Sequence, residues 1–409
     1  MRGRTNTWTR VLAAVAAACV ASAAQAAPGN GIRLGGSEAR LHPFFDFETR
    51  YDSNVTYSGT GAVGDAILHF RPGLELKAPG ELAAFEFSGA LDWAQYLGLE
   101  GDTKGLSRFY AYASLAAAFN RNGTVTPRVD NDFRRDVSTA SVTSLAAPVV
   151  SNMNRLVLAV PWKPGGGALV FAANGEWIVE TFEKYLSTST AQVSNLGYNQ
   201  YRAGGELQWR FLPRTSGVLQ ASYYTRVPNS PGQPDDGNGV DVVAGVTGLL
   251  TARVAATAKV GYGTASAAAF SIVPATSASS PIADIGIEWL PLDAISLRAG
   301  YTRSLGFDPV ASIFTQDAVL AVAQLKLAER YAFHVGGRWD SFNYKSVSGY
   351  TNSFLRIDPA VDAQFGRWLT GSLGYVYSTR TIVSWPVSLG PSPSSYSKNE
   401  VYVRVGVTY

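Results

Sequence analysis

Residues 401–409 read Val-Tyr-Val-Arg-Val-Gly-Val-Thr-Tyr, and this stretch decides the fold. Successive side chains of a β-strand point to opposite faces. One face of this strand is therefore wholly apolar, and it consists of Val401, Val403, Val405, Val407 and Tyr409. The other face carries Arg404 and Thr408. Such a strand at an open edge would invite aggregation in water. A lipid-facing position at the seam of a closed membrane barrel resolves that conflict.

The first 26 residues are predicted to be a secretory signal peptide. Arg2, Arg4 and Arg10 precede a short apolar core, and Ala24-Gln25-Ala26 fits the small-x-small cleavage rule. The core is shorter than the roughly 20 residues of a membrane helix. Lipoprotein processing at Cys19 is an alternative, but the usual branched aliphatic residue upstream is missing. We expect a short periplasmic segment at 27–43 and one outer-membrane barrel over 44–409.

Charge and cysteine content exclude several classes of function. The formal charge of +3 includes three arginines of the signal peptide, which leaves 31 basic and 31 acidic residues. A neutral chain does not argue for nucleic acid as a partner. Cys19 is the only cysteine, so residues 27–409 have no disulfide, thiolate metal site or cysteine nucleophile.

Short alternating segments recur along the whole chain. In 200–210, Tyr201, Leu207 and Trp209 oppose charged residues, and 331–340 alternates in the same way. The period of two indicates strands. A soluble sandwich would also alternate, so the connections carry more weight.

Short and long connections alternate strictly. Short turns are expected near 78–80, 120–123, 164–167, 212–215, 252–253, 290–293, 328–329 and 366–367. Longer loops are expected near 58–65, 98–106, 136–151, 185–197, 228–238, 266–280, 305–312, 344–350 and 382–396. This asymmetry is typical of outer-membrane barrels, which have short periplasmic turns and long outer loops. The sequence therefore predicts an all-β, antiparallel, up-and-down transmembrane barrel of about 18 strands with both termini periplasmic. A count of 16 strands remains an alternative, because 124–135 and 313–327 alternate poorly.

Aromatic residues near segment ends are expected to form girdles at the two lipid–water interfaces. The set is Phe44, Phe45, Trp93, Tyr96, Trp162, Trp177, Tyr198, Trp209, Tyr223, Trp289, Tyr301, Trp339, Tyr375 and Tyr377.

The polar faces of the strands predict a lumen wall of mixed charge. Its expected lining residues are Arg202, Glu206, Arg210, Arg298, Arg338, Asp340, Arg356, Asp358 and Arg404. Mixed signs suit a neutral or weakly charged hydroxylated solute, whereas a ring of one sign would suggest ion selectivity. The alternative is that these charges pair across strands and stiffen the wall. The loop at 136–151 is expected either to fold inward as a constriction or to remain an outer loop.

We expect no enzymatic activity, catalytic residue, cofactor or metal site. The three histidines are His42, His69 and His334. A hydrolase would need a Ser or Asp beside a His, and His334 has no evident partner in the pattern.

The run Phe47–Val55 resembles the opening strand of the β-barrel porin-2 family, which carries a Tyr-Asp-x-Asn-aliphatic motif. Leu212–Ser216 and Val246–Arg253 look similar to later parts of that family. The resemblance implies a barrel of an exopolysaccharide secretion system, working with a periplasmic polysaccharide-export protein.

The sequence thus leads us to expect a channel in the outer membrane of a Gram-negative bacterium. Its expected cargo is a secreted polysaccharide chain, and its other expected partners are outer-membrane lipid and the barrel-assembly machinery. The terminal strand resembles the signal that this machinery reads, so the expected membrane-insertion signal is Val401, Val403, Val405, Val407 and Tyr409. A general diffusion porin and a plugged structural or adhesion barrel remain alternatives.

Overall fold

A computed structural model describes residues 31–35, 38–138, 148–185, 196–229, 236–269, 274–308, 312–345, 350–383 and 394–409. The predicted signal peptide, and most of the predicted constriction at 136–151, lie outside these residues.

Almost all of the described chain is antiparallel β-structure. The long strands are β2 (Arg40–Asp52), β3 (Asp65–Ala78), β4 (Ala83–Tyr96), β5 (Arg108–Phe119), β6 (Arg128–Ser138), β7 (Val149–Trp162), β8 (Leu169–Lys184), β9 (Tyr198–Leu212), β10 (Thr215–Pro228), β11 (Gly237–Leu249), β12 (Val254–Ala267), β13 (Thr276–Leu292), β14 (Ile295–Asp308), β15 (Ser312–Leu327), β16 (Tyr331–Tyr344), β17 (Thr351–Gln364), β18 (Leu369–Val383) and β19 (Tyr396–Thr408). Strand β1 (Ile32–Arg33) pairs with the start of β2, and two short 3-10 turns complete the set, η1 (Lys104–Leu106) and η2 (Pro164–Gly166). No helix of the described chain has the length and apolar character to cross a membrane.

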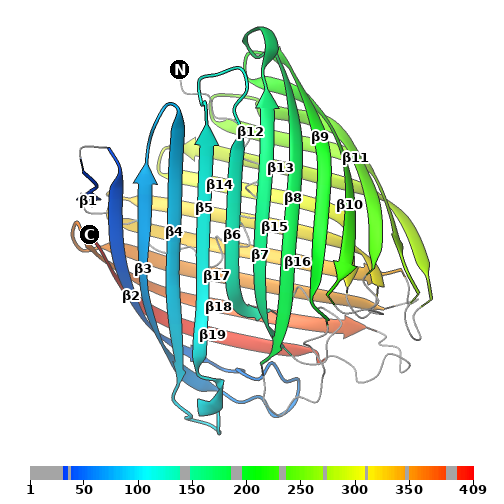
Figure 1. The fold of residues 1–409 in the computed structure, drawn as a ribbon. Coiled ribbons are helices and arrows are strands. Elements are labelled where there is room, and N and C mark those ends of the chain that lie inside the picture. Colours follow the sequence, from blue (N-terminus) through cyan, green and yellow to red (C-terminus); the bar gives the residue numbers. More distant parts are fainter. Residues whose placement is uncertain are drawn as a thin grey trace.

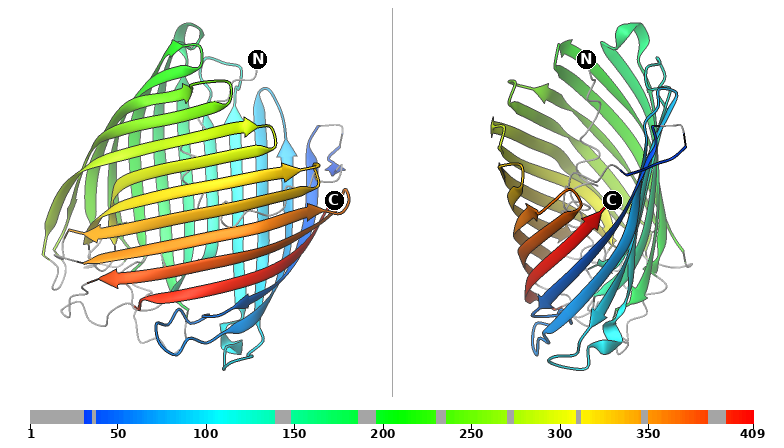
Figure 2. Two further views of the ribbon diagram at one scale, coloured as in Figure 1. Left: turned by 180° about the vertical axis from the view of Figure 1, so that it is seen from behind. Right: turned by 90° about the vertical axis from the view of Figure 1, so that its left-hand side faces the viewer.

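The strands close into one barrel. Each strand from β2 to β18 pairs with the next, and β19 pairs with β2 in a register that runs from Glu400↔Asp52 to Thr408↔Phe44. The prediction of 18 strands is confirmed, and the poorly alternating segments are full strands, β6 and β15. Figure 1 shows β4–β9 upright in front and β14–β19 running across behind them, and Figure 2 shows the same crossing from the back. Strands that tilt by about 35–45° from a barrel axis give opposite walls that cross at a steep angle.

The two ends of the barrel differ as predicted. Short connections gather at one end, which we call the turn end, and long ones at the other, which we call the loop end (Figure 1). Ala328 and Glu329, between β15 and β16, both have positive φ, 51° and 56°. They are the two central residues of the turn Leu327–Arg330, in which the N–H of Arg330 donates to the carbonyl of Leu327 at 3.2 Å. Positive φ at both central positions matches the twist of the adjoining strands, so the hairpin closes tightly.

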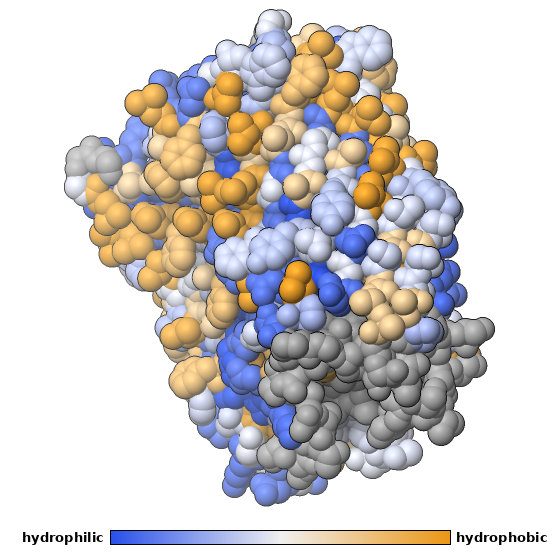
Figure 3. Space-filling view, turned by 45° about the vertical axis from the view of Figure 1, so that its right-hand side comes forward, coloured by the Kyte–Doolittle hydropathy of each residue, from blue (hydrophilic) through white to orange (hydrophobic). Residues whose placement is uncertain are grey.

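Most large apolar side chains lie on the outside of the barrel. In β19, Val403 is 53% exposed whereas Arg404 is 7% exposed, and the alternation continues along the strand. Figure 3 shows apolar side chains over much of this face of the molecule, with hydrophilic ones among them and at the lower end of the view. The arrangement inverts that of a water-soluble protein and suits a bilayer, because in lipid a closed barrel satisfies every backbone group.

Exposed aromatic side chains form two levels on this outer surface. On β9, Tyr201 lies toward the loop end and Trp209 toward the turn end, and both are exposed. Eight residues of a tilted strand separate them, or about 20 Å along the barrel axis, close to the height of an apolar bilayer band. Three predicted girdle residues were assigned wrongly. Tyr96 and Tyr198 are buried, and Phe44 shares the inward face of Glu48.

Candidate functional site

The predicted lining residues lie on the inward face, and most are paired there. The ion pairs are Arg202–Asp241 (3.1 Å), Arg298–Glu288 (3.6 Å), Arg338–Asp340 (2.6 Å), Arg356–Asp358 (3.5 Å) and Arg404–Glu48 (2.6 Å). Glu206 accepts a hydrogen bond from Gln208. Arg210 shares this face and is exposed near the turn end of β9. The wall therefore presents positive and negative groups side by side.

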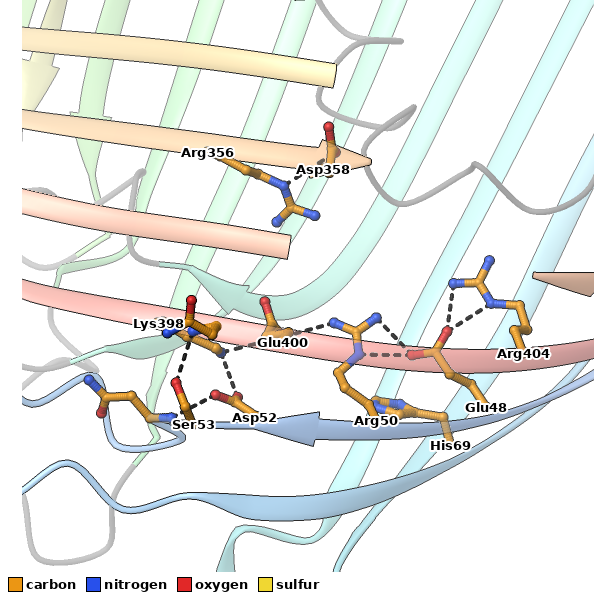
Figure 4. Close-up of polar contacts among 12 residues, drawn as sticks. Glu48, Arg50, Asp52, Ser53, His69, Arg356, Asp358, Lys398, Glu400 and Arg404 are labelled. Atoms are coloured by element: carbon orange, nitrogen blue, oxygen red, sulfur yellow. Dashed lines mark hydrogen bonds and ion pairs between the residues drawn. The ribbon is translucent and has the colours of Figure 1, made fainter. Parts of the chain in front are cut away.

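The tightest ionic cluster lies at the seam where β19 meets β2. Glu48 is fully buried, and its carboxylate contacts Arg50 at 2.7 Å, Arg71 at 3.0 Å and Arg404 at 2.6 Å. Figure 4 shows Glu48 between Arg50 and Arg404, with Arg50 reaching on to Glu400. The cluster therefore joins β2, β3 and β19.

Further ion pairs extend the seam cluster at both ends, and we call the whole the seam network. Arg71 contacts Asp92 at 2.8 Å, and the same carboxylate contacts Nδ1 of His69 at 2.9 Å. Toward the loop end, Lys398 contacts Asp52 at 2.7 Å. Of these residues the sequence had singled out Arg404 as a site residue. The signal for the rest was the charge at inward-facing positions of β2, β3, β4 and β19.

The first long loop, residues 53–64, packs against inward-facing side chains of the next strand, β19, and of more distant strands. The Tyr57 ring packs edge-on against Tyr396 of β19 and Tyr185 at the end of β8, with ring centroids at 5.2 and 6.0 Å. Nζ of Lys398 lies 4.2 Å from the Tyr57 ring centroid and donates a hydrogen bond to its hydroxyl. Burial raises the pKa of the Tyr57 hydroxyl well above its usual range, so this phenol stays neutral.

A second element enters the lumen from another part of the wall. Pairing between β13 and β14 stops at Ala283↔Arg303, two residues from Pro281, whose nitrogen has no hydrogen to donate. Beyond this point, Leu305 and Phe307 pack into a buried cluster with Tyr224 of β10. The tip of the β14–β15 hairpin therefore bends inward, because these apolar side chains find burial there.

His334 has a partner, contrary to the expectation from the sequence. Its Nδ1 lies 3.3 Å from Oδ2 of Asp362, and the hydroxyl of Ser372 donates to Oδ1 of the same carboxylate at 2.6 Å. The carboxylate stands between the hydroxyl and the imidazole. A nucleophilic triad requires the imidazole to contact the serine oxygen, and the imidazole of His334 does not. Within the described ranges, no group of three or more His, Cys, Asp or Glu side chains could hold a metal ion.

Comparison with known proteins gives remote structural similarity. No protein-family model and no curated protein matches the sequence, so the resemblance to the β-barrel porin-2 family has no such support. Pseudomonas aeruginosa OpdK, an outer membrane protein crystallised with vanillate, has 10% identity and a TM-score of 0.48, over 90% of this chain and 99% of OpdK. OccAB2 of Acinetobacter baumannii has 12% identity and a TM-score of 0.48, over 91% and 98%. The FrpB iron transporter from Neisseria meningitidis has 8% identity and a TM-score of 0.44, over 90% and 81%. At these values the similarities carry no conclusion about cargo.

The barrel's own construction identifies its place. A closed ring of 18 strands with an apolar, aromatic-bordered outer face and a charged inner face is built to span a bilayer. The protein is therefore an outer-membrane β-barrel.

Proposed function

We propose that the protein is a passive diffusion channel for small hydrophilic solutes. One observation carries the proposal: an 18-stranded ring with a charged, ion-paired inner wall. Barrels of 16 to 18 strands are too wide for wall side chains alone to fill and leave an aqueous channel. In this proposal the turn end faces the periplasm and the loop end faces outward, as is usual for such barrels.

The inner wall favours solutes without a strong charge. Each cation of the pairs Arg202–Asp241, Arg338–Asp340 and Arg356–Asp358 lies beside an anion, which cancels most of its long-range field. Conduction needs contacts weak enough to be exchanged, and paired charges partly exposed to water offer such contacts. The polysaccharide export expected from the sequence has no support in the comparisons. We therefore propose the diffusion channel, which the sequence offered as an alternative, in its place.

Reconstitution tests the proposal. The protein would be folded into liposomes, and swelling would be followed in isotonic solutions of a pentose and of larger oligosaccharides. We expect swelling in the pentose, little swelling in the largest sugar, and a discrete conductance in planar bilayers with weak ion preference. Liposomes with heat-denatured protein are the control. Absence of both signals would refute the diffusion channel and favour a plugged barrel.

A deletion strain separates diffusion from export. We expect slower uptake of small hydrophilic solutes with an unchanged amount of surface polysaccharide. Loss of surface polysaccharide with normal uptake would contradict the proposal and restore the export reading.

A further inference from the structure

The sequence motif at Tyr51–Val55 organises the first loop. Oδ1 of Asp52 accepts a hydrogen bond from the backbone of Asn54, while Oδ2 binds Lys398. The Asn54 side chain is 1% exposed. Its Nδ2 donates to the carbonyls of Ser58 and Ser397, and its Oδ1 accepts from the backbone N–H of Ser58. A buried amide that bonds three backbone groups fixes the path of the loop, because each bond left unmade would cost free energy.

Val55 anchors the same loop in the lumen. Its side chain is fully buried in a cluster with Tyr96 of β4, Val150 of β7 and Tyr185. Its backbone N–H bonds the carbonyl of Val63, which closes the loop on itself. The loop therefore has a folded conformation that depends on strands far from its own hairpin.

Tyr57 stands at the point where the loop reaches farthest across the barrel. Along the wall, β19 and β8 are seven strand steps apart, or about 34 Å at the usual strand spacing. Tyr57 nevertheless contacts Tyr396 of β19 and Tyr185 at the end of β8. Tyr185 in turn bonds the hydroxyl of Tyr96 at 3.0 Å. These contacts form a chord across the loop end of the lumen.

The backbone conformation at Tyr57 is one that its surroundings must hold in place. Its φ is 54°, in the left-handed region that a bulky side chain rarely occupies. Such a conformation persists where the surroundings hold it, and here Lys398, Tyr185 and Tyr396 surround the ring.

We infer that the first loop, residues 53–64, forms a size-limiting constriction, and that Tyr57 sets the largest solute that passes. This inference rests on the proposed diffusion channel and names the part of the channel that limits solute size. The motif Asp52-x-Asn54-Val55 holds the loop inward, and the phenol ring narrows the opening. The solutes concerned are the small hydrophilic molecules of the proposed diffusion channel.

Conductance tests the role of Tyr57. Tyr57→Ala removes the ring and leaves Asp52, Asn54 and Val55 in place. We expect a higher single-channel conductance and faster swelling in sugars that the wild type excludes. Thr60→Ala is the matched control, because Thr60 is exposed in the same loop and its side chain makes no hydrogen bond recorded among the described residues. Equal conductance and equal sugar exclusion in Y57A, T60A and a conducting wild type would overturn the inference.

Thiol labelling tests the position of the loop without any need for conduction. The only natural cysteine, Cys19, lies in the predicted signal peptide, so Val55→Cys introduces the single thiol of residues 27–409. We expect V55C to react slowly with a polar maleimide and T60C to react fast. Adding Asn54→Ala should raise the V55C rate roughly tenfold or more, since buried hydrogen bonds that hold the loop are lost.

The outcomes separate the two proposals. A V55C rate equal to that of T60C, or one unchanged by N54A, would overturn the inward, motif-held loop. If the wild type, Y57A and N54A all fail to conduct, the diffusion channel is refuted and the size limit falls with it. A silent wild type with conducting Y57A would refute the diffusion channel and would support the inward loop as a plug of the barrel.

Discussion

The seam network should make Glu48 one of the most sensitive positions for stability. Glu48→Gln keeps the shape of the side chain but removes the negative charge that faces three arginines. Arg50 and Arg71 retain Glu400 and Asp92, whereas Arg404, 7% exposed, loses the carboxylate that it contacts. Breaking a buried ion pair from one side costs about 3–5 kcal/mol. Because some of these arginines border the lumen, we expect the lower end, about 3 kcal/mol, or roughly a hundredfold in the folding equilibrium.

The assay is equilibrium urea unfolding in lipid vesicles, followed by tryptophan fluorescence. Glu288→Gln is the matched control, because its partner Arg298 lies 3.6 Å away and both side chains are about one-third exposed, 32% and 36%. Exposed pairs contribute about 0–1 kcal/mol. In the E48Q background, Arg404→Gln should recover part of the loss by removing the unpaired charge. Equal effects of E48Q and E288Q, or no recovery in the double variant, would refute the reasoning.

Three further outcomes are expected. Val405→Arg puts a charge on the lipid face and should cost about 2–4 kcal/mol near the bilayer centre; a smaller fraction of heat-modifiable, folded barrel in membranes would report it, and normal insertion would contradict it. Deleting Tyr409 removes the backbone bond to Pro43 and the contact of its carbonyl with His42. Assembly should then slow while assembled barrels conduct normally, and the reverse result would count against an insertion role. Phe307→Ala empties a buried site against Tyr224; we expect faster hydrogen exchange at the β14–β15 tip, with no change at β2 and β19.

The fold could be predicted because it depends on local pattern. The period of two in β9 and β16, and the alternation of short and long connections, are properties of neighbouring residues. Because lipid lies outside the barrel and water inside, the apolar face of each strand points outward and the polar face points inward. The strand count followed from the connections, even where β6 and β15 alternate poorly.

The girdle residues were assigned from their position along the strand alone, although the face of the strand is needed as well. Position along the strand gives depth in the bilayer, and parity gives the face. Tyr96 lies near a strand end but shares the parity of Asp92, and Phe44 shares that of Glu48. Parity alone would have placed both rings inside.

The constriction could not be predicted, because it depends on contacts between distant segments. Tyr57, Tyr185 and Tyr396 come together only once β8 and β19 occupy their places in the ring. The partner of His334 is also on another strand, at Asp362. A motif such as Asp52-x-Asn54 indicates that a loop is structured, but not which wall it meets.

The seam between β2 and β19 also has a consequence for the order of folding. Every other neighbour in the ring is joined by a hairpin, whereas Arg404 and Glu48 are 356 residues apart. Closing a loop of that length costs about 3 kcal/mol more in chain entropy than closing a loop of ten residues. The hairpins can therefore form early, and the ring closes last, with two unpaired strand edges exposed until then. The seam network lies where the ring closes last. Its ion pairs should therefore form after the hairpins, and they should stabilise the closed ring against reopening.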